Sequence, residues 1–136
     1  MQSDLSGRHY RWLGTATRHC RNSSFVEYKM AAIVVKGGRV INVGYNRMSP
    51  GFQKAKEYAY INHNMHRGIH AELDAILNLP AEILKDATIY VSGITKGGHL
   101  VKSKPCEACQ RVLHRYGVKT VIYHEQNGQA FIYNVG

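Results

Sequence analysis

A strand–helix–strand pattern in the second half of the chain limits the fold more than any other feature. Ala87 to Gly93 and Val118 to His124 have the apolar, β-branched character of strands. Between them a helix begins at Pro105, a residue that the first helical turn tolerates, and ends at Gly117. Its apolar stripe consists of Cys109, Val112, Leu113 and Tyr116. Two strands joined by a crossover helix form a parallel pair with a right-handed connection. The pattern therefore predicts an α/β fold in which helices cover a mixed sheet.

Three further segments extend this sheet to about five strands. Met30 to Lys36 and Arg39 to Tyr45 are rich in Val and Ile, and they flank Gly37-Gly38, the residue types of a two-residue hairpin turn. Ala130 to Val135 follows Asn127-Gly128, which is another turn pair. We expect this last strand to run antiparallel to the strand before it.

The spacing of apolar residues predicts helices elsewhere. A helix near the N-terminus contains Leu5, Trp12, Leu13, Ala16 and Cys20 on one face. Another starts near His70 and is closed by Pro80, with apolar positions Ile69, Leu73, Ile76 and Leu77. The long polar connection before it is expected to hold a short helix over Gln53 to Ile61, because such connections are usually functional or partly helical.

The chain has 136 residues and a mass of 15.3 kDa, which fits one domain over residues 1–136. Its composition is that of a globular protein, with 44% hydrophobic and 20% charged residues, and this excludes disordered and collagen-like classes. The longest apolar run, Met30 to Val35, is far below the roughly 20 residues of a membrane-spanning helix. No apolar block of signal-peptide type stands near the start. We expect a soluble, cytoplasmic protein with no membrane partner.

The chain is strongly basic. Eighteen Lys and Arg against nine Asp and Glu give a net charge of +9. Positive fields attract phosphate-bearing partners, so nucleotides and nucleic acids are candidate ligands; basic residues that only keep the protein soluble are the alternative. The charge is partly clustered. Four arginines share a stretch in which Asp4 is the single acidic residue, and three lysines lie in a segment without acidic residues. These residues are Arg8, Arg11, Arg18 and Arg21, and Lys96, Lys102 and Lys104.

Two of the three cysteines form a pair that suits a metal. Cys106 and Cys109 are separated by one helical turn, so both thiolates can reach one ion. Their place at a helix start lowers the thiol pKa, which favours the thiolate that a metal requires. An odd cysteine count without a secretory signal makes a disulfide framework a poor explanation. A zinc site is favoured over a redox dithiol.

His70 and Glu72 stand at the start of the preceding predicted helix. His70 offers a nitrogen as a third ligand. In a regular helix positions two apart point about 200° away from each other, so both side chains face one metal only if His70 lies at the non-helical edge of the first turn. A three-ligand zinc leaves one position to water and lowers its pKa toward about 7. Glu72 would then accept a proton from this water and deliver it to the substrate. Singly, a surface histidine and a first-turn glutamate are the commoner explanations; together with the cysteines they indicate a site.

These residues carry a family resemblance. His70-Ala71-Glu72, followed after 32 intervening residues by Pro105-Cys106-Glu107-Ala108-Cys109, resembles the signature of the zinc-dependent cytidine and deoxycytidylate deaminase superfamily. The resemblance implies a cytidine-deaminase-like three-layer fold with the site at two helix N-termini. It implies that His70, Cys106 and Cys109 bind Zn²⁺ and that Glu72 shuttles protons. Asn46 resembles a residue that contacts the substrate sugar, and Ala71 resembles a backbone donor to the base carbonyl.

The reaction that the resemblance implies is hydrolytic deamination of cytosine to uracil. Glu72 protonates the ring nitrogen N3, a water activated by zinc adds to C4, and the amino group leaves as ammonia after a second proton transfer. The resemblance also implies a homo-oligomer, because members of this superfamily commonly complete their pockets across subunits.

The substrate class is less well determined by the sequence. Gly44-Tyr45-Asn46 with Pro50-Gly51, and histidine before Ala71-Glu72, are similar to deoxycytidylate deaminases. The terminal hairpin is more similar to cytidine deaminases and deaminase toxins. The basic loop Gly93 to Lys104 could hold a phosphate through Lys96, Lys102 and Lys104. With the net charge, this favours deoxycytidylate or cytidylate over the nucleoside.

Three alternatives stay open at this stage. A polynucleotide deaminase acting on cytosine or adenine in single-stranded DNA or RNA would stack bases on aromatic residues. A zinc-stabilised nucleic-acid-binding module is the non-enzyme alternative, although structural zinc sites usually have four protein ligands. The third alternative is a second zinc site. The other explanation of its candidate residues is that the histidines lie in a polar loop and the cysteine is a buried free thiol. The stacking candidates are Trp12, for which core packing is favoured, Tyr45, Tyr58 and Tyr60; the second zinc would involve Cys20, His63 or His66.

Overall fold

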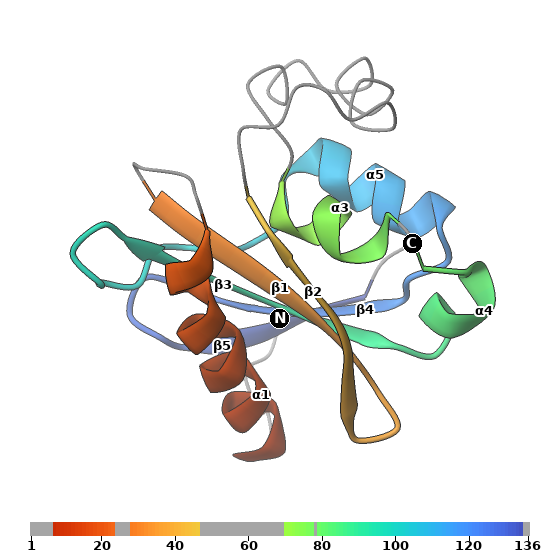
Figure 1. The fold of residues 1–136 in the computed structure, drawn as a ribbon, viewed down its shortest axis with the longest axis horizontal. Helices are drawn as coiled ribbons and strands as arrows, with labels where there is room; N and C mark the ends of the chain where they lie inside the picture. Colours follow the sequence, from red (N-terminus) through yellow and green to blue (C-terminus); the bar gives the residue numbers. More distant parts are fainter. Residues whose placement is uncertain (1–6, 24–27, 47–69, 78, 135–136) are drawn as a thin grey trace.

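The computed structural model describes residues 7–23, 28–46, 70–77 and 79–134, and these contain one five-stranded sheet in the order β2-β1-β3-β4-β5 (Figure 1). Only β3 and β4 are parallel, so the sheet is mixed, as predicted. The strands are β1 (Tyr28–Lys36), β2 (Arg39–Tyr45), β3 (Thr88–Thr95), β4 (Thr120–His124) and β5 (Ala130–Asn134). The helices are α1 (Gly7–His19), the 3₁₀ turn η1 (Cys20–Asn22), α3 (Ala71–Ile76), α4 (Ala81–Leu84) and α5 (Glu107–Arg115).

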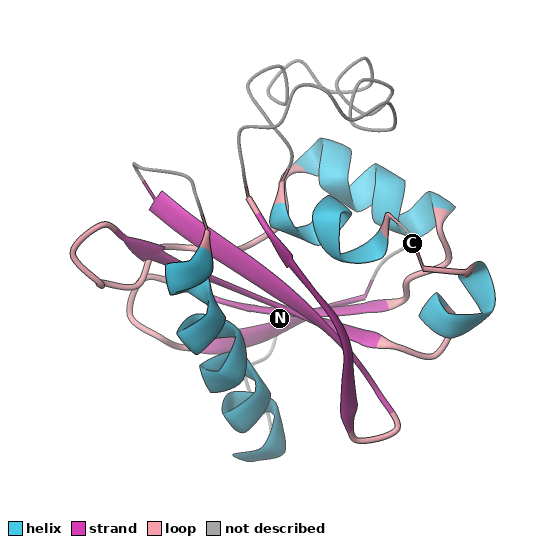
Figure 2. Ribbon diagram, in the orientation of Figure 1, coloured by secondary structure: helices cyan, strands magenta, loops and turns pink. Residues whose placement is uncertain are grey.

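Helices cover the sheet on both faces, which gives three layers (Figure 2). The inner strand β1 shows why, because all five residues from Ala31 to Val35 are buried. Ala32 and Val34 belong to the core beneath α3 and α5, whereas Ile33 and Val35 belong to a second core beneath α1. Since successive side chains of a strand point to opposite faces, the central strand needs a cover on each side. The helix α1 therefore lies on the face of the sheet opposite α3 and α5 (Figure 1).

The β1–β2 hairpin forms as the sequence predicts. Gly37 and Gly38 have φ angles of 61° and 75°, the left-handed conformation that a two-residue turn of this type requires at both positions. The β4–β5 pair is antiparallel, also as predicted. The expected strand end at Val135 and the expected helix over 53–61 lie outside the described residues.

Several element boundaries differ from the prediction. The helix expected from near His70 to Pro80 is shorter: α3 ends at Ile76, and Pro80 instead precedes a separate short helix, α4, which the spacing analysis did not anticipate. The strand β3 continues past Gly93 to Thr95. The helix α5 begins at Glu107 rather than Pro105 because Cys106 has the extended backbone of an N-cap.

The start of β4 is also later than expected. After α5, the amide of Val118 donates to the Leu113 carbonyl at 3.0 Å while Gly117 has a φ of 85°, which is the hydrogen-bonding pattern that closes a helix C-terminus. This uses Val118 in the cap, and the strand begins at Thr120. Within the described part of the chain, no helix combines the length and the apolar character needed to cross a membrane.

A close approach of α3 to β2 positions the start of α3. A Cβ atom at Gly44 would lie 2.5 Å from the Ala71 carbonyl oxygen and 2.6 Å from Ala75 Cα, so only glycine fits. Two hydrogen bonds reinforce the contact: the Tyr45 amide donates to Asp74 Oδ2 at 2.9 Å, and Asn42 Nδ2 donates to the Ala75 carbonyl at 2.8 Å. The backbone of α3 is therefore held directly against the edge strand.

We expect Gly44→Ala to lower the free energy of unfolding by about 1–3 kcal/mol, because the new methyl group meets backbone atoms that cannot move independently. The matched control is Gly14→Ala in α1, where the nearest atom to a Cβ is Arg18 Nη1 at 3.9 Å. This control should be neutral or stabilising, since alanine is favoured over glycine in a helix by about 0.8–1 kcal/mol. Urea unfolding of both variants measures the difference, and equal stability of the two would contradict the packing argument.

Candidate metal centre

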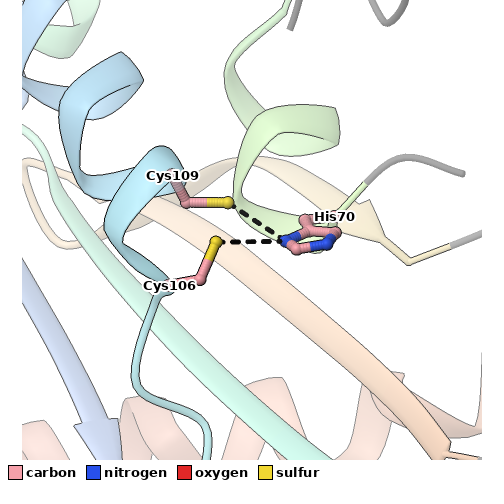
Figure 3. Close-up of side chains that lie close together, drawn as sticks. All are labelled: His70, Cys106 and Cys109. Atoms are coloured by element: carbon pink, nitrogen blue, oxygen red, sulfur yellow. Dashed lines mark hydrogen bonds between the residues drawn. The ribbon is translucent and has the colours of Figure 1, made fainter. Parts of the chain in front are cut away.

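Three side chains with metal-ligand chemistry meet where the N-termini of α3 and α5 come together (Figure 3). His70 is the N-cap of α3, with φ −80° and ψ 152°, and Cys106 is the N-cap of α5, with φ −70° and ψ 166°. Both residues are therefore extended, and Cys109 follows in the first turn of α5. His70 and Glu72 can face one metal only if His70 lies at the non-helical edge of its helix, and the N-cap position of His70 meets this requirement.

The donor atoms are as close as one shared ion would need. His70 Nδ1 lies 3.1 Å from Cys109 Sγ and 3.7 Å from Cys106 Sγ, and the donor atoms all lie within 4.8 Å of one another. With Zn–S bonds of about 2.3 Å and a Zn–N bond of about 2.0 Å, tetrahedral ligands are separated by roughly 3.5–3.8 Å. One imidazole and two thiolates are also a donor set that zinc prefers. The residues present therefore fit a zinc ion.

The pKa values of the two cysteine thiols are shifted in opposite directions. The Cys109 thiol, together with His70, hydrogen-bonds the Cys106 sulfur and lowers the pKa of Cys106 to about 3, against the opposing effect of burial. The pKa of Cys109 is raised by its hydrogen bond to Cys106, by burial and by the charge of Glu72. Burial alone lowers the pKa of His70, but the Cys106 sulfur and the Glu72 carboxylate outweigh it and the net direction is upward. The hydrogen bonds within the cluster therefore favour the thiolate form of Cys106.

Glu72 lies in the first turn of α3 beside this cluster and is 4% exposed. Burial raises the pKa of its carboxyl group, while the nearby His70 partly opposes the shift. A carboxyl group with a raised pKa exchanges protons more readily near neutral pH than an ordinary glutamate does. Ala71, which precedes it, is also buried, and its amide belongs to the first turn, where backbone N–H groups lack intrahelical acceptors.

Asn46 occupies a buried position just after β2, where its side chain extends the β1–β2 pairing. Its Oδ1 atom accepts the Met30 amide at 2.8 Å and the Ser23 hydroxyl, and its Nδ2 atom donates to the Tyr28 carbonyl at 3.1 Å. This gives Asn46 a structural role that the sequence did not indicate. Its contact with a substrate sugar stays a prediction.

The three loop lysines are all exposed. Lys96 follows β3 directly, and Lys102 and Lys104 lie in the segment that leads to Cys106. The Lys104 ammonium nitrogen is 6.0 Å from the centroid of the Tyr123 ring, a cation–π distance. Their role in phosphate binding stays a prediction.

The other aromatic and metal candidates lie away from this cluster or outside the described residues. Trp12 packs with Tyr90 in the core beneath α1, as favoured from the sequence, and the Tyr45 hydroxyl lies 3.3 Å from His19 Nδ1. Cys20 is fully buried, and burial raises the pKa of its thiol to about 11. His63 and His66, like Tyr58 and Tyr60, lie outside the described residues.

Sequence reasoning missed the residues that hold the two helix starts in place. Asp74 and Asn42 dock α3 on β2, and the Ser103 hydroxyl donates to the Val91 carbonyl at 2.7 Å just before α5. The sequence offered one signal for these residues, the acidic side chain of Asp74 two positions after Glu72. A buried serine before the cysteine helix gave none, because serine is an ordinary loop residue.

Comparisons with known proteins agree on one family. The family model described as the cytidine and deoxycytidylate deaminase zinc-binding region matches residues 7–125. A protein of Mycobacterium phage D29 named deoxycytidylate deaminase is 28% identical over 130 residues, which cover 85% of this chain and 93% of the relative. The deoxycytidylate deaminase of Schizosaccharomyces pombe is 27% identical over 112 residues, which cover 80% of this chain and 34% of the relative.

Solved structures agree with the fold. The crystal structure of cytidine deaminase from Burkholderia pseudomallei has a TM-score of 0.65 at 18% identity and covers 94% of this chain and 93% of its own. The dCMP deaminase from the cyanophage S-TIM5 has a TM-score of 0.52 at 22% identity and covers 94% of this chain and 89% of its own. At these identities the structures support the cytidine-deaminase-like fold alone.

We expect the purified protein to contain one zinc ion per chain, held by the described cluster. The double variant Cys106→Ser, Cys109→Ser should lose this zinc, because hydroxyl groups are poor ligands for it. The matched control is Cys20→Ala, which removes the third cysteine at a buried position away from the cluster and should keep full zinc content. Elemental analysis of the three proteins is the measurement. Full zinc content in the double variant would contradict the ligand assignment.

Proposed function

Because this chain belongs to the cytidine and deoxycytidylate deaminase zinc-binding family, we propose that it hydrolytically deaminates a free cytosine nucleotide. The family makes it a zinc-dependent hydrolase, and we assign deoxycytidylate or cytidylate as the preferred substrate over the unphosphorylated nucleoside. The single observation that carries the proposal is the His70, Cys106 and Cys109 cluster with a buried carboxylate beside it. The relatives from phage D29 and S. pombe, which carry the name deoxycytidylate deaminase, support the nucleotide.

Zinc, when bound by His70, Cys106 and Cys109, lowers the pKa of a water molecule from about 15.7 toward 7 and so supplies a nucleophile at neutral pH. The chain's contribution is proton transfer by Glu72. Its carboxylate takes a proton from the attacking water and delivers it to the ring nitrogen N3, while the water oxygen bonds to C4. A second proton passes through Glu72 to the amino group, the C4–N bond breaks, and ammonia leaves.

Ala71 and Asn46 are assigned to substrate binding. The Ala71 amide would donate to the base carbonyl, which is supported by its place in the first turn of α3. Asn46 Nδ2 carries a second hydrogen beyond the one donated to Tyr28, and this hydrogen would contact the sugar. The fixed hydrogen bonds of Asn46 to β1 support this role, because a positioned donor binds without losing side-chain freedom.

Phosphate recognition is assigned to Lys96, Lys102 and Lys104, the exposed lysines between β3 and α5. A nucleotide phosphate needs only a few cations, and lysine is a common phosphate binder. A homo-oligomer and a cytoplasmic location both fit an enzyme of the free nucleotide pool, and they stay predictions. Light scattering coupled to size-exclusion chromatography measures the first of these.

We expect Glu72→Gln to keep the zinc and the fold but to lose activity by about 10²- to 10⁴-fold, the range of positioned acid–base catalysis. The matched control is Glu107→Gln, an exposed glutamate in the first turn of α5, which should retain activity near that of the parent protein. Steady-state release of ammonia and zinc content are measured together. Parent-like activity in Glu72→Gln would exclude the proton shuttle, and loss of its zinc would favour a structural zinc module.

We expect deamination of deoxycytidylate or cytidylate to exceed that of cytosine in a single-stranded oligonucleotide. Changing Lys96, Lys102 and Lys104 to Gln should raise KM for the nucleotide more than for the nucleoside, because only the nucleotide carries a phosphate. The charge-matched control changes Arg39, Lys85 and Lys119, which are exposed elsewhere, to Gln. Product analysis at two salt concentrations tests the ranking. Strong, salt-sensitive turnover of the oligonucleotide without turnover of any monomer would reverse it.

A further inference from the structure

The N-terminal arginines are a clustered part of the positive charge that the proposed activity does not use. They lie on α1 and η1, and α1 packs against β1, β3 and β4 on one face of the sheet. The metal cluster lies with α3 and α5 on the other face (Figure 1). A substrate at the metal cluster is therefore on the other side of the sheet from the arginines of α1, and these need another explanation. Arg21, in η1, lies nearer the candidate site, because the Ser23 hydroxyl two residues later donates to Asn46.

The arginines form a single stripe along the outer side of α1. Arg8, Arg11 and Arg18 recur at helical spacing and are all exposed. The sheet-facing side is made instead by Leu13 and Ala16, which are buried. At 100° per residue the two sets point in nearly opposite directions. Arg21, in η1, continues the exposed basic surface. We call this surface, made of Arg8, Arg11, Arg18 and Arg21, the arginine stripe.

Within the described segment that carries it, the arginine stripe has no acidic neighbour in sequence. Residues 7–23 contain no acidic side chain, and α1 has none in its first turn. Among the described residues, the side-chain hydrogen bond of a stripe guanidinium goes to a neutral partner: Arg18 Nη2 donates to Thr15 Oγ1 at 3.0 Å. From Arg8 to Arg18 the helix rises about 15 Å, so the charges are spread in a line rather than gathered around one small anion. A linear array of this kind suits a linear polyanion.

We propose that the arginine stripe binds the phosphate backbone of nucleic acid, without base specificity and independently of the metal site. Guanidinium groups match phosphate oxygens in bidentate geometry. The described aromatic residues of α1 are engaged with the sheet: Trp12 packs with Tyr90, and the Tyr10 hydroxyl accepts the Ala130 amide at 3.2 Å. We therefore assign the affinity to the guanidinium groups, so duplex and single strands should both bind.

A membrane surface suits the stripe less well. A helix that lies on a bilayer inserts an apolar face between the lipids. The apolar residues of α1, chiefly Leu13 and Ala16, are buried against the sheet and cannot be presented to lipid without unfolding this core. Apart from Tyr10, which is 41% exposed, the surface that α1 offers to a partner is charged and polar.

The test measures binding of the zinc-loaded full chain to a labelled 20-base-pair duplex and to one of its single strands. For the duplex, three neutralised phosphates give a slope of about −2.7 for log K against log salt, so Arg8, Arg11 and Arg18 should account for about a 40-fold loss of affinity between 50 and 200 mM salt. The variant Arg8→Gln, Arg11→Gln, Arg18→Gln should lower the magnitude of the slope by about 2.7. Glutamine is a good helix former, and circular dichroism confirms that α1 is retained.

The control for net charge is the triple variant Arg39→Gln, Lys85→Gln, Lys119→Gln, which removes the same number of positive charges from exposed sites outside α1. It should keep the parent slope. An equal loss in both variants would overturn the proposal, because it would mean that net charge alone attracts the polyanion. So would a parent protein that does not bind the duplex at low salt, or one that binds acidic phospholipid vesicles but no oligonucleotide.

A second measurement separates the arginine stripe from the metal site. Deoxycytidylate deamination by the parent should be unchanged when the duplex is saturating, and the stripe variant should keep the parent kcat/KM. Inhibition of deamination by the duplex would place the nucleic acid across the metal site and overturn the proposal. Binding is measured directly, so failure of the deaminase assignment would leave the result on the arginine stripe interpretable.

Discussion

The contact between α3 and β2 at Gly44 is the constraint on which the site depends. His70 and Glu72 belong to the start of a helix of six residues, which is too short to be stable by itself. Its position is fixed from outside, by a glycine that allows backbone to meet backbone and by the hydrogen bonds of Asp74 and Asn42. The edge strand of the sheet therefore determines where the imidazole and the carboxylate stand.

The start of α5 is fixed in a different way, by the preceding segment 101–103, which hydrogen-bonds to both β3 and β4. The Val101 amide donates to the Gly93 carbonyl at 3.0 Å and the Ser103 amide to the His124 carbonyl at 3.0 Å, so this segment fills the gap beyond the β3–β4 pairing. His124 closes the gap from β4, with Nε2 2.8 Å from the Ser92 hydroxyl. The cysteine pair thus stands at the carboxyl ends of the parallel strands, the usual place for sites in α/β folds.

The parts that could be predicted from sequence are those with local signals. Gly37-Gly38 determines its turn through its own conformational freedom. The spacing of Cys106 and Cys109 narrows them to a metal site or a redox dithiol, and their context at a helix start beside His70 favours the metal. The face of the sheet that α1 covers could not be predicted, because an amphipathic pattern shows that one side of a helix is buried but not against what. The buried Ser92 and Ser103 were missed for a similar reason, since their partners come from distant strands.

Charge arithmetic at the metal site explains why phosphate recognition must lie elsewhere. Two cysteine thiolates balance the charge of Zn²⁺, His70 is a neutral ligand, and Glu72 adds a negative charge when it is ionised. The cluster with its ion would therefore be neutral or negative and would offer a phosphate dianion no net attraction. Any preference for a nucleotide over a nucleoside has to come from cations outside the cluster. The exposed lysines between β3 and α5 belong to the segment that carries Cys106, so that segment supplies both a metal ligand and cations outside the cluster.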